Sequence, residues 1–268
     1  MKAAAFDYTQ PGTAAAACAL LAASSGMAKL IAGGQSLGPM LNLRLAQPDS
    51  LVDLGAITAL ADVRDEGAAI FIGAGVTHAA IEDGLVADPS RGLLPYVASN
   101  IAYRAIRNRG TLGGSLAHAD PAADWVNTMR VLDATYLIDG PGGRREVASG
   151  DFMQAAFTTT LAEDEVLAGV RITKCSLAAR FGYFKYCRKV GEFAEAIAAV
   201  LVDPARGVKR AVIGATAGAP HLVRDIDAVL RGDAQVIAAE VRAAGCDKPY
   251  EIQMHRVALQ RAVAEATA

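Results

Sequence analysis

The sequence predicts an α+β fold, and three observations carry that prediction. Segments with strand-like and helix-like patterns intermix along the 268 residues without the regular βαβ period of a doubly wound sheet. A hydrophobic fraction of 53% and a charged fraction of 20% indicate a globular chain, long enough for one large domain or two to three small ones. Aromatic residues make up only 6%, and alanine supplies much of the apolar content, which favours helices packed through small side chains.

Helix signals in the N-terminal third come from capping residues. The pattern predicts a helix from Thr13 to Ser24, with Gly26 at the position of a helix C-cap. Pro39 suits the first turn of a further helical segment, and Thr77 caps a helix that runs to about Asp83. Short apolar runs predict strands at residues 29–31, 51–54 and 69–72.

The remainder of the chain continues the mixed pattern. It predicts a helix over residues 126–132, a hairpin with strands 135–138 and 145–147, and a strand over 165–172. We expect a domain boundary near residues 173–177. Beyond it the sequence predicts a strand over 181–188, a strongly apolar helix from Glu192 to Val202, a strand over 208–213, and two or three alanine-rich helices in the last fifty residues.

Charge, hydropathy and cysteine spacing exclude several classes of protein. The formal net charge is −2, which argues against a protein that binds nucleic-acid backbones. No apolar run approaches the roughly 20 residues of a membrane span, and the N-terminus has no secretory or twin-arginine pattern. The four cysteines lie far apart, which argues against a disulfide scaffold, a zinc site or an iron–sulfur cluster on this chain. We therefore expect a cytoplasmic protein.

Two glycine pairs are the strongest chemical signal. Gly33-Gly34 precedes Gln35-Ser36, and Gly113-Gly114 precedes Ser115. Glycine leaves no Cβ between backbone N–H groups and a ligand, so such loops form anion-binding concavities, and two facing loops could hold a pyrophosphate. The alternative is that each pair is only a tight turn. Neither loop matches the Rossmann or Walker patterns.

Four groups of charged residues have both a functional and a structural interpretation. Arg104, Arg107 and Arg109 form either a phosphate or partner-docking surface or a solvated loop. Asp124 is either an acceptor for a ribose hydroxyl or a surface charge. Lys185 would pair with a phosphate or a flavin carbonyl, or extend to solvent. His118 is expected to be structural rather than a metal ligand, because no second histidine has ligand spacing. No nucleophile with its base is apparent.

Two sequence strings resemble a known family. They are AGGQS at residues 32–36, followed by Leu37, Pro39 and Leu43-Arg44-Leu45, and RNRGTLGGSLAHADPAAD at residues 107–124. Together they resemble the FAD-binding medium subunit of the molybdenum hydroxylases, the family of carbon monoxide dehydrogenase and xanthine dehydrogenase. The resemblance spans essentially the whole chain.

The resemblance implies a two-part FAD-binding domain of the vanillyl-alcohol-oxidase (PCMH) type over residues 1–174, with subdomains of about 1–57 and 58–174, and a small α+β domain over 175–268. Both glycine loops would wrap the FAD pyrophosphate, Lys185 would face the polar edge of the isoalloxazine ring, and Phe193 could shield one flavin face. The cofactor-binding residues that it implies are Lys29, Leu30, Ile31, Ala32, Gly33, Gly34, Gln35, Ser36, Leu37, Thr77, Ile101, Gly110, Thr111, Gly114, Ser115, Leu116, Asp124, Leu167 and Lys185.

The same resemblance implies partners. A small subunit would carry two [2Fe–2S] clusters and a large subunit the molybdopterin, in a dimer of heterotrimers, and this chain would pass electrons from the clusters through FAD to an acceptor. Relatives often have a bulkier hydrogen-bonding residue such as histidine where this chain has Gln35, so the subfamily, the hydroxylated substrate and the final acceptor (quinone, NAD or dioxygen) stay open. The alternatives are a single-chain flavin oxidoreductase of the same fold and a non-redox nucleotide-binding scaffold.

Overall fold

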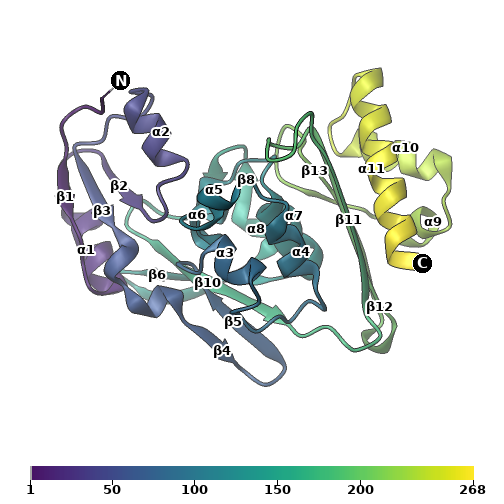
Figure 1. Ribbon diagram of the computed structural model, residues 1–268, viewed down its shortest axis with the longest axis horizontal. Coiled ribbons are helices and arrows are strands. Elements are labelled where there is room, and N and C mark those ends of the chain that lie inside the picture. The colour runs from purple at the N-terminus through teal and green to yellow at the C-terminus, as the bar shows by residue number, and fades with distance from the viewer. Residues whose placement is uncertain (1) are drawn as a thin grey trace.

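A computed structural model describes residues 2–268 and shows three larger β-sheets with helices between and around them (Figure 1). The N-terminal sheet stands at one side of the molecule and the C-terminal helices at the other, with the second sheet and a group of short helices between them. The α+β prediction is confirmed. Within the described residues, no helix is both long and apolar enough to cross a bilayer.

The first sheet is parallel, with strand order β1-β3-β2. Its elements are β1 (Asp7–Thr9), α1 (Ala14–Ala23), β2 (Ala28–Ile31), α2 (Leu37–Asn42) and β3 (Ser50–Asp53). The sequence analysis did not find β1, which is only three residues long. The predicted C-cap at Gly26 is wrong, because α1 ends at Ser24. Gly26 instead makes room for Asp49, whose Oδ2 would lie 2.4 Å from a Cβ there.

The second sheet is antiparallel, with strand order β4-β5-β10-β6-β7. Its strands are β4 (Val63–Asp65), β5 (Ala69–Gly73), β6 (Thr135–Gly140), β7 (Gly143–Ala148) and β10 (Val166–Thr173). The predicted hairpin over 135–147 is confirmed. Thr77 caps α3 as predicted, since its hydroxyl accepts from the backbone N–H of Ala80.

Short elements accompany this sheet. The helices are α3 (His78–Glu82), α4 (Leu93–Ser99), α5 (Arg104–Arg107), α6 (Leu112–His118), α7 (Asp124–Leu132) and α8 (Ser149–Phe152). A ribbon consists of β8 (Met153–Ala155) and β9 (Thr158–Thr159), and 3-10 turns cover Leu54–Ala56, Thr58–Ala61 and Pro204–Arg206. The predicted domain boundary lies in the connection from β10 to β11, and the division into domains stays a prediction.

The third sheet is antiparallel, with strand order β11-β12-β13-β14. Its strands are β11 (Arg180–Tyr186), β12 (Ala196–Asp203), β13 (Val208–Gly214) and β14 (His221–Leu222). The helices α9 (Ile226–Leu230), α10 (Ala234–Ala243) and α11 (Pro249–Thr267) follow, as the alanine-rich pattern predicts. The helix predicted from Glu192 to Val202 is wrong, because most of that segment is the central strand β12.

The physical reason for that error is burial on both faces of the strand. Ile197, Ala199 and Leu201 belong to the core shared with the second sheet, whereas Ala198 and Val200 belong to the core under α11. A strand buried on both sides has no polar alternation, and its continuous apolar run cannot be distinguished from a buried helix by periodicity. The sheet thus lies between α7 and α11, and side chains of β11 contact Asp124 at the start of α7.

Candidate functional site

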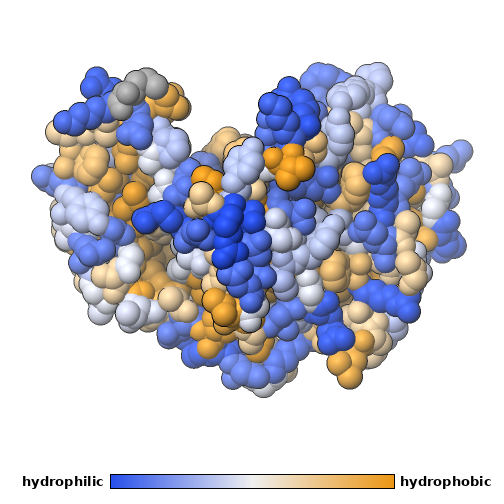
Figure 2. Space-filling view, in the orientation of Figure 1, coloured by the Kyte–Doolittle hydropathy of each residue, from blue (hydrophilic) through white to orange (hydrophobic). Residues whose placement is uncertain are grey.

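A cavity of about 960 Å³ lies where the N-terminal sheet, the short helices and the edge of the third sheet meet. Figure 2 shows the surface hollowed between the lobe that carries the N-terminus and the middle of the molecule. The structure places 18 of the 19 predicted cofactor-binding residues on its wall; Leu116 is the exception, because its side chain is fully buried in the core. A volume near 1,000 Å³ with a mainly apolar wall is at the upper end of the usual range for cofactor sites.

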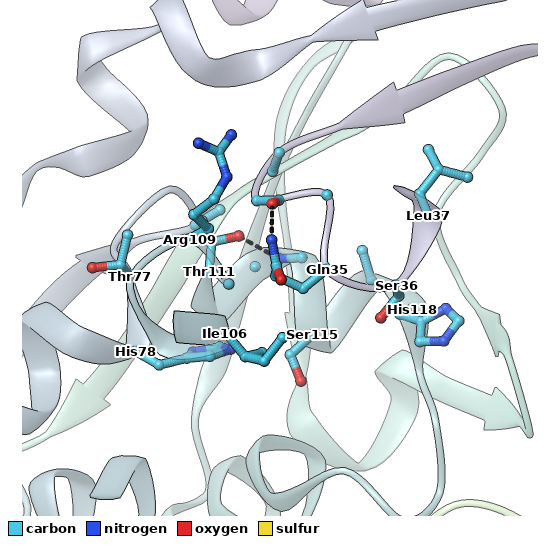
Figure 3. A pocket seen from close by; sticks show the side chains of 18 of the residues that line it. Gln35, Ser36, Leu37, Thr77, His78, Ile106, Arg109, Thr111, Ser115 and His118 are labelled. Carbon is cyan, nitrogen blue, oxygen red and sulfur yellow. Dashed lines mark hydrogen bonds between the residues drawn. The ribbon is translucent and has the colours of Figure 1, made fainter. Parts of the chain in front are cut away.

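The first glycine loop forms an open cup of backbone donors. The N–H groups of Gly33, Gly34, Gln35 and Ser36 donate to no acceptor in the described part of the chain. Gly34 has a left-handed φ of 70°, which helps to turn successive N–H groups to one side, as in an anion-binding nest. Gln35 folds back on the loop, and its Nε2 donates to the carbonyl of Gly33 at 2.9 Å (Figure 3). Adjacent backbone N–H groups without acceptors are the arrangement that favours binding of an anion.

Gly33 also sets the distance between the two predicted loops. A Cβ at this position would lie 2.0 Å from the carbonyl oxygen of Arg109 and 2.8 Å from the Cα of Gly110. The two backbones therefore touch, and only a residue without a side chain fits there. Both glycine loops line the same cavity, and the prediction that together they hold a pyrophosphate stays a prediction.

The second glycine pair differs from the prediction. The N–H of Gly113 donates to the carbonyl of Ala74 at 2.8 Å, and that of Gly114 donates to the Thr111 hydroxyl at 3.0 Å. These amides are already paired, so the second loop is not an open amide cup. Its Gly113 instead allows close packing, since a Cβ there would lie 2.3 Å from the Ala74 side chain. The donors that this wall offers are the hydroxyl of Ser115 and the N–H of Thr111, which have no acceptor within residues 2–268.

A buried ion pair between Lys185 and Asp124 forms another part of the cavity wall. Lys185 on β11 donates from Nζ to Asp124 Oδ2 at 2.9 Å and to the carbonyl of Asn100 at 3.2 Å. Tyr183 donates its hydroxyl to the other oxygen of Asp124 at 2.8 Å. The side chains of Lys185 and Asp124 are 10% and 6% exposed. Asp124 therefore holds Lys185 in place rather than acting as a surface charge.

Burial affects the pKa of Asp124 and of its partner Tyr183. It raises the pKa of Asp124 above its usual value, while Lys185 and then Tyr183 act in the opposite direction. Burial and the neighbouring Asp124 carboxylate raise the pKa of Tyr183 well above its usual value, so its hydroxyl stays a donor. The result is a cation fixed at the cavity wall, with the aspartate oxygens occupied by Lys185 and Tyr183.

His78 is a wall residue that the sequence analysis missed. Its Nδ1 accepts from the indole N–H of Trp125 at 3.0 Å, which places the proton of the neutral ring on Nε2. The ring is 5% exposed, and burial first and then the nearby Arg107 lower the pKa of His78 to about 4. The sequence signal that could have identified His78 was its position directly after Thr77, the residue that caps α3.

The neutral state of His78 predicts that the protein is less stable in acid. Its folded pKa of about 4 lies below the usual 6.5, so folding is favoured above pH 6.5 and this contribution is lost as the pH falls towards 4. At 1.36 kcal/mol per unit, the loss between pH 7 and pH 4 is about 3 kcal/mol. Urea unfolding of wild type and of His78→Asn, whose amide oxygen still accepts from Trp125, measures it. Equal pH slopes for the two proteins would refute the assignment.

Two of the three predicted arginines have acidic partners. Arg104 pairs with Glu82 and Asp83, and Arg107 pairs with Glu82, so on α5 their charges are already neutralised and they are not a free phosphate-docking surface. Arg109 is exposed at the edge of the cavity. His118 packs against Phe157 with ring centroids 5.2 Å apart. No cluster of three or more metal-ligating side chains occurs in the described residues.

Phe193 lines the cavity and is 64% exposed. Tyr103 and Gly191 also line it, and a Cβ on Gly191 would approach the Tyr103 ring to 2.8 Å. The cavity wall therefore includes two exposed aromatic rings, and a role for Phe193 against a flat ligand stays a prediction.

Comparisons with known proteins agree with this geometry. Residues 4–174 match the family described as FAD binding domain in molybdopterin dehydrogenase. The chain is 36% identical to the carbon monoxide dehydrogenase medium chain of Afipia carboxidovorans, over 98% of this chain and 97% of that one. It is 34% identical to the nicotine 6-hydroxylase medium subunit of Paenarthrobacter nicotinovorans, over 87% of this chain and 82% of that one. Its structure matches a chain of carbon monoxide dehydrogenase from Hydrogenophaga pseudoflava with a TM-score of 0.91 and 31% identity, covering 100% of this chain and 99% of that one.

Proposed function

Because the chain belongs to the family of FAD-binding domains in molybdopterin dehydrogenases, we propose that it is the medium subunit of a heterotrimeric molybdenum hydroxylase. In this proposal it passes electrons from [2Fe–2S] clusters on a small subunit to an external acceptor, while a large subunit carries the molybdopterin. The complex would be a cytoplasmic dimer of heterotrimers. It would hydroxylate a small organic or heteroaromatic compound or oxidise carbon monoxide.

The residues present fit FAD. The unpartnered amides at Gly33 to Ser36 match the acceptor oxygens of a pyrophosphate, and this cup is the observation that carries the proposal. The apolar part of the wall, which includes Ile101 and Leu167, suits flat aromatic rings, and Lys185 supplies a fixed positive charge. Bound FAD would supply the redox chemistry, and this chain would bind it, orient it and tune its potential.

Each part of the wall has a separate task in this proposal. The Gly33 cup would neutralise phosphate charge through its N–H donors, and Ser115 would add a hydroxyl donor. Lys185, held by Asp124, would favour negative charge on a reduced flavin. The cavity is lined by no cysteine, so the clusters that deliver electrons would belong to another chain.

FAD binding is the direct test. Titration of FAD-free protein with FAD is expected to quench flavin fluorescence with a stoichiometry of one FAD per chain and a dissociation constant at or below about 1 μM, equivalent to roughly 8 kcal/mol. The same protein should show flavin absorption near 450 nm. Folded protein that retains no FAD after it has been mixed with excess FAD and the unbound FAD has been removed would overturn the proposal.

A native pull-down tests the partners. We expect the chain to copurify with one iron–sulfur protein and one molybdenum protein. Reduction of its FAD by an organic substrate in the absence of other chains would instead favour a single-chain oxidoreductase.

A further inference from the structure

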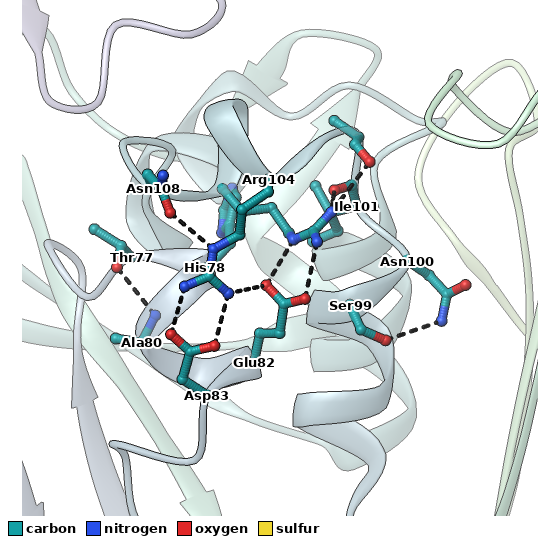
Figure 4. Close-up of polar contacts among 12 residues, drawn as sticks. Thr77, His78, Ala80, Glu82, Asp83, Ser99, Asn100, Ile101, Arg104 and Asn108 are labelled. Atoms are coloured by element: carbon teal, nitrogen blue, oxygen red, sulfur yellow. Dashed lines mark hydrogen bonds and ion pairs between the residues drawn. The ribbon is translucent and has the colours of Figure 1, made fainter.

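One arginine of the RNRG string is buried behind the wall of the cavity, next to residues that line it. Arg107 on α5 is 11% exposed, and its Nε and Nη2 donate to the two oxygens of Glu82 at 2.7 Å and 2.8 Å. Its remaining nitrogen, Nη1, donates to the carbonyls of Ile101 and Ala102 at 2.9 Å and 3.1 Å. Figure 4 shows Glu82 on α3 and the turn at Ile101, and the hydrogen bonds of Arg107 join the two.

The turn that Arg107 holds is strained and lies against the cavity. Ala102 has a φ of 44°, in the left-handed region that costs a residue with a Cβ free energy. Ile101 and Ala102 line the cavity. Such a conformation persists only where neighbouring contacts impose it, and the two carbonyl contacts of Arg107 are those contacts.

The same turn holds Lys185 from its other side. The carbonyl of Asn100 accepts from Lys185 Nζ at 3.2 Å, directly before the two carbonyls that Arg107 holds. Three consecutive carbonyls thus bind two cations. One cation is paired with Glu82 behind the wall, and the other is paired with Asp124 at the wall.

We propose that the Glu82–Arg107 pair is a positioning device that fixes the Asn100–Ala102 turn and, through the carbonyl of Asn100, sets where the ammonium of Lys185 stands in the cavity. Arg107 is a positioning residue and touches no ligand itself. The planar guanidinium suits this task because it can engage a carboxylate with two donors and still reach two carbonyls. The inference rests on the proposed function, since bound FAD reports the position of Lys185.

Arg104 provides a matched control. It also pairs with Glu82, at 2.8 Å, and with Asp83, but its side chain is 48% exposed and donates to no carbonyl of the turn. Arg104→Gln therefore removes a similar charge from the same cluster and leaves the turn in place. A general effect of charge on FAD would appear in both variants.

The experiment compares Arg107→Gln and Arg104→Gln in two backgrounds, wild type and Asp124→Asn/Lys185→Met. In the wild-type background, Arg107→Gln should weaken FAD binding about tenfold and move the midpoint potential of bound FAD to more negative values, as loss of a cation near reduced flavin would. A tenfold change in the relative affinity for the two oxidation states corresponds to about 30 mV for a two-electron couple. Arg104→Gln should leave FAD affinity within about twofold of wild type, and a twofold change in relative affinity corresponds to a potential shift of only about 9 mV.

The Asp124→Asn/Lys185→Met background shows whether Arg107 acts by positioning Lys185 or only by stabilising the fold. Without the Lys185 ammonium, Arg107→Gln should produce no further change in potential, because coupled residues give non-additive effects. Equal potential shifts in both backgrounds, or equal shifts for Arg104→Gln and Arg107→Gln, would overturn the inference. If Arg107→Gln does not fold, Glu82→Gln replaces it with the same expected pattern. Wild-type protein that fails to bind FAD would refute the proposed function instead.

Discussion

The Gly33→Ala protein is expected to bind FAD about a thousandfold more weakly than wild type, which corresponds to roughly 4 kcal/mol. The added Cβ would lie 2.0 Å from the Arg109 carbonyl and 2.8 Å from the Gly110 Cα, and both are backbone atoms that cannot rotate away. One of the two loops must move, and the amide cup moves with it. Loss of two hydrogen bonds to a charged group, at about 1.5–3 kcal/mol each, accounts for that magnitude.

Gly38→Ala is the matched control for this variant. Gly38 lies five residues further along, in α2, and a Cβ there would meet nothing within 4 Å. Because alanine is the better helix former, this change should leave FAD affinity unchanged and stabilise α2 slightly. Fluorescence titration of FAD into both proteins measures the difference. Wild-type affinity in Gly33→Ala would show that the contact between the loops does not shape the FAD site.

The sequence identified the right loops but not how each of them works. Gly33-Gly34 and Gly113-Gly114 look equivalent as strings, and both border the cavity. The Thr111 hydroxyl that occupies the amide of Gly114 is a local helix cap, but only the fold shows that the carbonyl of Ala74 occupies the amide of Gly113. Ala74 follows the end of β5, almost forty residues before Gly113, so no local sequence pattern predicts this hydrogen bond.

Pairing between distant residues limited the other predictions in the same way. Lys185 and Asp124 were each identified by sequence, but their ion pair depends on the third sheet packing against α7. The error at β12 has a related cause. Both faces of that strand are buried, one in the core with α7 and the other under α11, and burial on both faces cannot be read from the strand's own residues. Capped helices such as α1 and α3 were predicted well, since the hydroxyls of Thr13 and Thr77 act within a few residues.

Replacing Lys185 by methionine is expected to lower the free energy of unfolding by about 3–5 kcal/mol, the usual effect of removing one partner from a buried ion pair. Asp124 would keep the Tyr183 hydroxyl as a donor, but its charge would have no compensating cation, and burial would raise its pKa further. The double variant Asp124→Asn/Lys185→Met removes both charges and should recover most of the lost stability. Chemical unfolding of the three FAD-free proteins measures these differences.

The same variants separate the structural role of the pair from its proposed effect on bound FAD. If the Lys185 ammonium favours the anionic reduced flavin, its loss makes the midpoint potential of bound FAD more negative in both variants, and most negative in the single variant, where the Asp124 charge is uncompensated. Stability should recover in the double variant, whereas the potential should stay more negative than that of wild type, because the ammonium is absent from both. A Lys185→Met protein with full FAD content and an unchanged potential would refute the electrostatic role. In that case the pair would serve only to join β11 to α7.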